Sequence, residues 1–213
     1  MHGFLMTRPF TITTTLCTLD EAMITCTYRH DGSHAAYPFR FVFEVSYILR
    51  GSSFDVEMVF TNNDASTVPV GLGWHPYFKI AEKADDIFMQ IPDCQIVEAD
   101  ERQLPTGKKQ PFSAFKTLAQ IHDFKLDNTF LLNQTDGRAE VMLRSESGVL
   151  TYWQNVDNQN WQFLQIFIPP ARKSIALEPM SCNVDAFNNQ EGLKCLKTGE
   201  ILRGVFGVQF SKK

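Results

Sequence analysis

The sequence predicts an all-β fold, and more specifically a β-sandwich. Several segments alternate apolar and polar residues, the 213-residue chain contains 18 phenylalanines, and 12 glycines and 10 prolines interrupt it at short intervals. Aromatic residues favour strands, whereas glycine and proline favour turns. Residues 113–120 are the one helical candidate. Roughly nine or ten short strands with almost no helix are typical of a sandwich.

Residues 39–49 form the clearest predicted strand, because every odd-numbered position in this segment is apolar or aromatic. A turn at residues 50–53 follows, and apolar residues alternate again over 54–60, so the two segments predict a hairpin with one apolar face. Weaker alternation predicts further strands, and continuous apolar runs predict buried ones. These strands are expected at residues 22–28, 87–91, 139–143, 149–153, 163–168, 175–177 and 205–210.

Charge and composition exclude several classes of protein. The net charge of −4 gives no cationic field for binding nucleic acid. No apolar stretch approaches the roughly 18 residues that span a bilayer, and the first residues do not resemble a signal peptide, so we expect no membrane association. The five scattered cysteines favour free thiols and a cytoplasmic protein. Without a repeat or a linker, residues 1–213 are expected to form one domain.

One candidate site residue, His75, follows a probable strand at residues 66–70. Pro76 forces an extended backbone at this histidine, which places the imidazole at the end of a sheet. The neighbouring Trp74 and Tyr77 offer flat surfaces that stack on sugar rings or pack in a core. Taken alone, the segment favours a partly buried histidine in an aromatic core layer over a binding site.

Carboxyl groups form the second kind of candidate. Glu178 directly follows an apolar strand; burial would raise its pKa, whereas a protonated histidine nearby would lower it. Asp127 and Asn128 offer a carboxylate and an amide that suit sugar hydroxyls and turns equally well. His30 and His34 suggest a metal ligand pair, but no third ligand lies nearby in the sequence, so no metal site is predicted.

In their order along the chain, four motifs resemble the aldose 1-epimerase (galactose mutarotase) family, in its bacterial branch. They are His2-Gly3, Gly-Trp-His-Pro-Tyr-Phe at 73–78, Leu-Asp-Asn-Thr-Phe at 126–130, and Leu-Glu-Pro-Met with Asp-Ala-Phe-Asn over 177–188. The resemblance implies a large antiparallel β-sandwich, the galactose mutarotase-like supersandwich, with the site in a groove across one sheet. Family members carry further strands before the His-Gly motif, so the chain is expected to lack N-terminal strands.

The resemblance also implies the role of each matching residue. Glu178 matches the catalytic base, His75 the general acid, and His2 and Asp127 the residues that bind sugar hydroxyls. From the chemistry of their side chains, Asn128 is expected to bind hydroxyls as well, while Trp74, Tyr77 or Trp153 would cover a ring face.

The expected activity is that of an isomerase of carbohydrate metabolism, which interconverts the α and β anomers of a free aldohexose. This reaction requires one base and one acid, so no metal or organic cofactor is expected. In relatives that act on hexose 6-phosphates a threonine follows the histidine, whereas Pro76 stands here, which favours a sugar without phosphate.

Two other functions stay open at this point. A protein of the same fold that binds carbohydrate without catalysis would need the same motifs, and a glycosidase would need two carboxyl groups, such as Glu178 with Asp127 or Asp185. Missing N-terminal strands would leave sheet edges uncovered, so association of the chain with a second copy is also expected.

Overall fold

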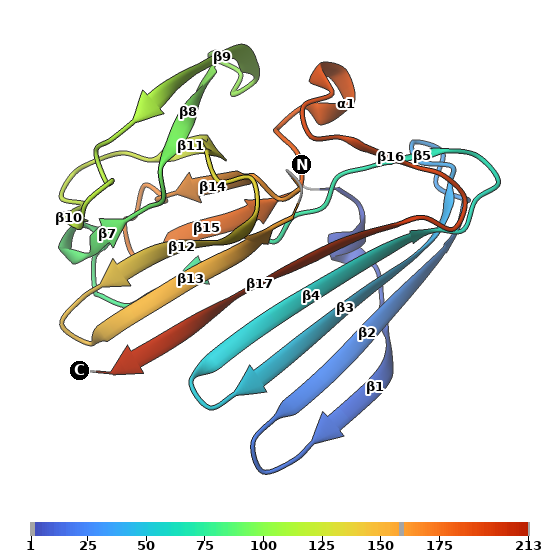
Figure 1. Ribbon diagram of the computed structural model, residues 1–213, viewed down its shortest axis with the longest axis horizontal. Helices are drawn as coiled ribbons and strands as arrows, with labels where there is room; N and C mark the ends of the chain where they lie inside the picture. Colours follow the sequence, from blue (N-terminus) through green and yellow to red (C-terminus); the bar gives the residue numbers. More distant parts are fainter. Residues whose placement is uncertain (1–2, 158–159, 213) are drawn as a thin grey trace. The chain divides into compact units, whose positions relative to one another are not determined.

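The computed structural model describes residues 3–157 and 160–212, and it confirms the all-β prediction (Figure 1). Its few helices are short: the 3₁₀ turns Leu5–Thr7 and Ala84–Asp86 and the helix α1, Ala186–Asn189. The helical prediction for residues 113–120 is wrong, because this segment is a turn followed by strand β10. An eight-residue segment is too short to form a stable helix from propensity alone, and Phe115 of its turn is buried in the core.

The chain forms two compact units. The first unit extends to Val70 and includes Lys194–Val205, and the second contains Gly71–Leu193 and the C-terminal residues from Phe206. Strand β17, Ile201–Lys212, therefore has its first residues in one unit and its last residues in the other. Whether the two units fold as one domain stays a prediction.

The first unit is built from antiparallel hairpins. The predicted hairpin is confirmed as β3 and β4, which turn at Arg50 and Ser53 and bury Phe43 and Phe60 opposite each other. Neighbouring strands pair in the order β1, β2, β3, β4, and β5 pairs with β16. The strands are β1 (Thr11–Cys17), β2 (Ala22–Asp31), β3 (Arg40–Arg50), β4 (Ser53–Asn62), β5 (Val68–Val70) and β16 (Lys194–Leu196).

The second unit contains two antiparallel sheets. The first has the order β17, β13, β12, β7, β10, and the second has the order β6, β15, β14, β11, β8, β9. Strands of the first are β13 (Gly148–Val156), β12 (Gly137–Arg144), β7 (Phe88–Gln90) and β10 (Ala119–Gln120). Strands of the second are β6 (Tyr77–Phe78), β15 (Ile175–Met180), β14 (Phe163–Phe167), β11 (Asp127–Leu132), β8 (Cys94–Ala99) and β9 (Pro105–Phe112).

The core of the second unit lies between its two sheets, which confirms the predicted sandwich. Leu143 and Tyr152 come from one sheet, and Phe130, Ile166 and Leu177 come from the other; all five are at most 1% exposed. Since strand residues alternate between the faces of a sheet, burial of one face of the six-stranded sheet leaves its other face for polar residues. The candidates Glu178, Asp127 and Tyr77 lie on this sheet, and His75 directly precedes its strand β6.

None of the helices among the described residues has the length and apolar character needed to cross a membrane.

Candidate active site

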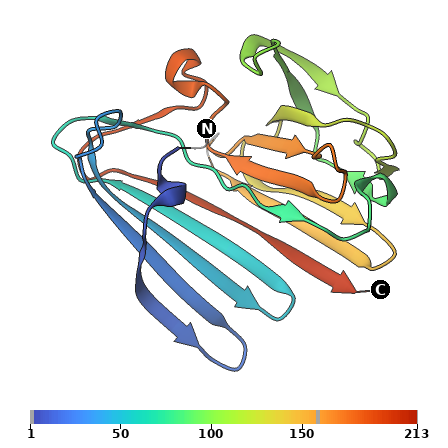
Figure 2. The ribbon, with the colours of Figure 1, turned by 180° about the vertical axis from the view of Figure 1, so that it is seen from behind.

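His75 and Glu178 lie directly opposite each other at one side of the six-stranded sheet. The short strand β6 runs beside β15 (Figure 2). Tyr77 of β6 pairs with Ala176 of β15, and Gly73 forms an isolated bridge with Met180. The same antiparallel register places His75 across from Glu178, and side chains that face each other in this way lie close together on one face. His75 Nε2 is 3.3 Å from Glu178 Oε1.

Two glycines allow this close approach of the backbones. A Cβ atom on Gly71 would overlap the Sγ of Cys182, and one on Gly73 would lie 3.2 Å from the carbonyl oxygen of Pro179. The backbone N–H of Trp74 donates a hydrogen bond to that same oxygen, at 3.2 Å. The Gly-Leu-Gly segment is therefore explained by packing against the continuation of β15, and it holds His75 in register with Glu178.

Burial dominates the electrostatics of Glu178. Only 10% of its side chain is exposed, and burial, followed by the negative charge of Asp127, raises the pKa of Glu178 from 4.5 to about 7. The sequence left open whether burial or the histidine would decide this pKa. His75 is 31% exposed and stacks on Tyr77, with ring centroids 4.9 Å apart, so the pair opens to solvent on the histidine side.

Gln165 extends the row of polar side chains across the sheet. It lies opposite Glu178 in the β14–β15 pair and opposite Thr129 in the β11–β14 pair. Its Nε2 donates a hydrogen bond to Asp127 Oδ1 at 3.0 Å, and its Oε1 accepts one from Thr129 Oγ1 at 2.6 Å. His75, Glu178, Gln165, Thr129 and Asp127 therefore lie on one face of the sheet.

The structure does not bring every candidate to this face. Trp74 precedes His75 and stacks instead on Phe206, with centroids 5.5 Å apart. Strand alternation directs Asn128 to the face opposite Asp127, and its Oδ1 accepts the backbone N–H of Asp127 at 3.3 Å.

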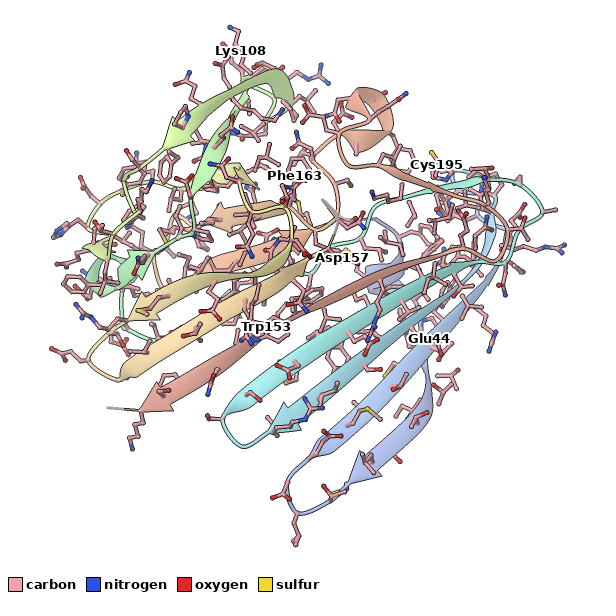
Figure 3. All side chains as sticks on the ribbon, in the orientation of Figure 1. Glu44, Lys108, Trp153, Asp157, Phe163 and Cys195 are labelled. Atoms are coloured by element: carbon pink, nitrogen blue, oxygen red, sulfur yellow. The ribbon has the colours of Figure 1, made fainter. Side chains whose placement is uncertain are left out.

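Three further candidates remain, of which the structure describes two. Trp153 belongs to β13 of the other sheet (Figure 3). The guanidinium of Arg138 lies 4.1 Å from its ring centroid. His2 is outside the described residues. Asp185 accepts a hydrogen bond from the side chain of Asn188 at 2.6 Å, which is a local turn interaction.

Gln165 and Thr129 are site residues that the sequence analysis missed. Gln165 is the one polar residue in the apolar segment 163–168, and an amide inside such a strand must find partners. This single polar residue in an apolar strand was the signal from which Gln165 could have been identified. Thr129 carries no comparable signal, because threonine is common in strands.

Within the described ranges, no group of three or more His, Cys, Asp or Glu side chains could hold a metal ion. His30 and His34 both pack against the ring of Phe4, at centroid distances of 5.3 and 4.5 Å. All five cysteines are free thiols.

The site thus combines a carboxyl group whose pKa lies near neutrality, an imidazole in contact with it, and a second carboxylate held by an amide. Groups of this kind define a class of proteins that can exchange protons with a polar ligand by acid/base chemistry.

The chain belongs to the aldose 1-epimerase family, whose model matches residues 1–209. A curated relative, the uncharacterized protein YihR of Escherichia coli K12, is 27% identical over 218 residues, which cover 100% of this chain and 68% of that protein.

Solved structures show the same fold. A galactose mutarotase-like protein from Clostridium acetobutylicum superposes with a TM-score of 0.86 at 17% identity, covering 100% of this chain and 69% of that one. Galactose 1-epimerase from Lactobacillus acidophilus gives a TM-score of 0.79 at 16% identity, covering 95% and 66%. These similarities confirm the galactose mutarotase-like fold, and the chain spans about two thirds of the length of these relatives.

Proposed function

We propose that the chain is an aldose 1-epimerase, or mutarotase, which interconverts the α and β anomers of a free aldohexose. The observation that carries this proposal is the contact between Glu178 and His75, 3.3 Å apart, on a sheet face that also presents Asp127. Membership of the aldose 1-epimerase family supports it.

The chemistry of the reaction explains why an acid and a base in contact suit it. Opening the hemiacetal removes the proton of the C1 hydroxyl and adds a proton to the ring oxygen. Both oxygens are bonded to C1, so the base and the acid must be neighbours. Glu178 takes the hydroxyl proton while His75 protonates the ring oxygen; after rotation about the C1–C2 bond the two transfers run in reverse and close the ring on the other face.

The raised pKa of Glu178 matches this role. A general base works best when its pKa lies near the working pH, because it is then both ionised and basic enough. In our proposal Asp127 binds hydroxyl groups of the sugar, and the exposed ring of Tyr77 lies beside the anomeric centre. Hydroxyl binding by His2 and Asn128 stays a prediction.

The pH dependence of anomer exchange tests the base. With a pKa of about 7, the ionised fraction of Glu178 rises roughly tenfold between pH 6 and pH 8, so the rising limb of the kcat/KM profile should have its inflection near pH 7. Initial rates measured by polarimetry, corrected for the buffer rate, give this profile. Asp127→Asn removes a negative charge that raises the pKa and should move the inflection to lower pH. An inflection near pH 4.5 in the unmodified protein would exclude a buried Glu178 as the base.

Gln165→Leu tests the hydrogen bond from Gln165 to Asp127. A hydrogen bond to a charged group contributes about 1.5–3 kcal/mol, so we expect KM to rise roughly tenfold while kcat changes less than KM. Gln209→Leu, an exposed glutamine on β17, is the matched control. Equal losses of kcat in both variants would indicate a general effect on the fold and not a role in binding.

The proposed activity is tested by polarimetry on freshly dissolved α-anomers of several aldohexoses. Faster mutarotation than in buffer is expected for at least one sugar. Saturable binding with no acceleration would identify a carbohydrate-binding protein without catalysis, and release of aryl groups from aryl glycosides would identify a glycosidase.

We also propose that two copies associate through β1. This strand is the outermost of its sheet, all seven of its residues are exposed, and none of them is charged. An uncharged edge strand presents unpaired backbone groups to a second chain. Sedimentation velocity measures the oligomeric state and so tests this association.

The cytoplasmic location of the protein stays a prediction.

A further inference from the structure

Arg172, in the connection between β14 and β15, joins three loops at one end of the six-stranded sheet. Its Nε donates to Asp85 Oδ1, and its Nη2 donates to the carbonyl oxygens of His122 and Phe124 at 2.6 and 3.2 Å. Its own carbonyl oxygen accepts the N–H of Ala84 at 2.8 Å. One guanidinium can bind several acceptors at once because its donors lie in a rigid plane.

The strand register brings these three loops together. Residues 79–86 leave β6 where its antiparallel partner β15 begins, and residues 121–126 enter β11 where its partner β14 ends. Arg172 lies between β14 and β15 and therefore meets both loops. The three loops lead to or from the strands on which the proposed site is built.

Asp127 is the site residue that depends most directly on this cluster. It is the first residue of β11, and the end of a strand opens more easily than its middle. The chain before it is held by Arg172, through the carbonyl of Phe124, and by the hydrogen bond from the N–H of Ile168 to the carbonyl of Leu126 at 2.9 Å. The guanidinium binds backbone oxygens of this loop, so it fixes the path of the chain that leads to Asp127.

The position of Asp127 has an electrostatic consequence for Glu178. After the larger effect of burial, the negative charge of Asp127 raises the pKa of Glu178. The interaction between two charges weakens with distance, so an Asp127 that moves away from β15 lowers this pKa. Two other ionisable groups interact with Glu178. His75 contacts it, and Tyr152 in the core stays neutral because burial raises its pKa well above the usual value.

We propose that Arg172 is a positioning residue, which sets the distance between Asp127 and Glu178 by tying the loop before β11 to the loop before β15. It acts through the chain that carries Asp127 and not on the sugar itself. The inference rests on the proposed function, because that function gives the two carboxyl groups their roles.

Arg172→Lys tests this role without removing the positive charge. The ammonium group can keep the ion pair with Asp85, but it lacks the planar set of donors that also reaches two carbonyl groups. We expect KM for the sugar to rise about fivefold, the effect of roughly one hydrogen bond, while kcat changes less than KM. The inflection of the kcat/KM profile should move to lower pH. Since the charge is kept, such a shift reports a change in geometry.

Arg172→Gln is the second variant, and it removes the charge. Loss of a nearby cation by itself raises the pKa of a carboxyl group, which is the opposite of the expected shift. A lower inflection in this variant as well therefore comes from the movement of Asp127. Circular dichroism establishes that both variants are folded.

A second measurement does not depend on activity. The pKa of Glu178 is determined without sugar, by nuclear magnetic resonance titration of carbon-13-labelled glutamate side chains, and the Glu178→Gln variant identifies its signal. This pKa should fall in Arg172→Lys. It should not fall further when Arg172→Lys is added to Asp127→Asn, because the effect of Arg172 passes through the charge of Asp127.

Arg50→Lys is the matched control, since Arg50 is an exposed arginine that also pairs with two carboxylates, in the first unit. It should leave KM, kcat and the pKa of Glu178 unchanged. Unchanged values in a folded Arg172 variant, or a further fall of the pKa in the Asp127→Asn background, would overturn the inference. If no sugar is accelerated while the pKa responds as expected, the proposed function fails and the positioning of Asp127 by Arg172 stands.

Discussion

Replacing Glu178 with glutamine should lower the rate constant of anomer exchange by about 10²–10⁴-fold, the usual contribution of a positioned proton-transfer group. Glutamine has nearly the same shape as glutamate but cannot accept the proton of the C1 hydroxyl at neutral pH. Because the side chain of Glu178 is buried and contacts His75, the effect should fall on kcat and not only on KM. Polarimetry at the pH optimum of the unmodified protein compares the two rates.

The matched control for this variant is Glu146→Gln, at an exposed glutamate in the turn between β12 and β13. It makes the same chemical change far from β15 in the sequence and should leave the rate within about twofold. Circular dichroism of both variants establishes that they are folded. A folded Glu178→Gln protein with the full rate would remove Glu178 from the mechanism.

His75→Asn is expected to have an effect of similar size, about 10²–10⁴-fold on kcat. The asparagine amide donates hydrogen bonds but does not release a proton to the ring oxygen. His122→Asn is the control, because His122 is exposed and its φ of 48° is a conformation that asparagine tolerates.

The double variant of Glu178 and His75 adds a test of their contact. Two groups that transfer protons within one step act as a unit, so the double variant should be little slower than either single one. If the rate loss of the double variant equals the product of the losses of the two single variants, the two side chains act independently, in spite of the 3.3 Å distance between them.

Much of the fold could be predicted from alternation alone. The regular pattern of residues 39–49 and 54–60 identifies a hairpin because each strand has one buried face, as β3 and β4 confirm. The division into two units could not be predicted, because it depends on the return of Lys194–Val205 to the first unit. Such a return is a long-range contact that local patterns do not encode.

The site was predictable where a residue type and a motif coincided, as at Glu178 and His75. It was not predictable where the face of the sheet to which a side chain points determines whether that side chain reaches the site. Trp74 and His75 are neighbours in the sequence, yet Trp74 stacks on Phe206 while His75 meets Glu178. Gln165 was overlooked because its partners, Asp127 and Thr129, lie on another strand and only the register of β11 and β14 joins them.

The most direct test of the central claim is exchange spectroscopy by nuclear magnetic resonance on an aldohexose at anomeric equilibrium, with binding measured on the same sample. The account predicts that the unmodified protein speeds the exchange between the α and β signals, and that Glu178→Gln binds the sugar but leaves the exchange near the buffer rate. Saturable binding by the unmodified protein, with exchange no faster than in buffer, would contradict it.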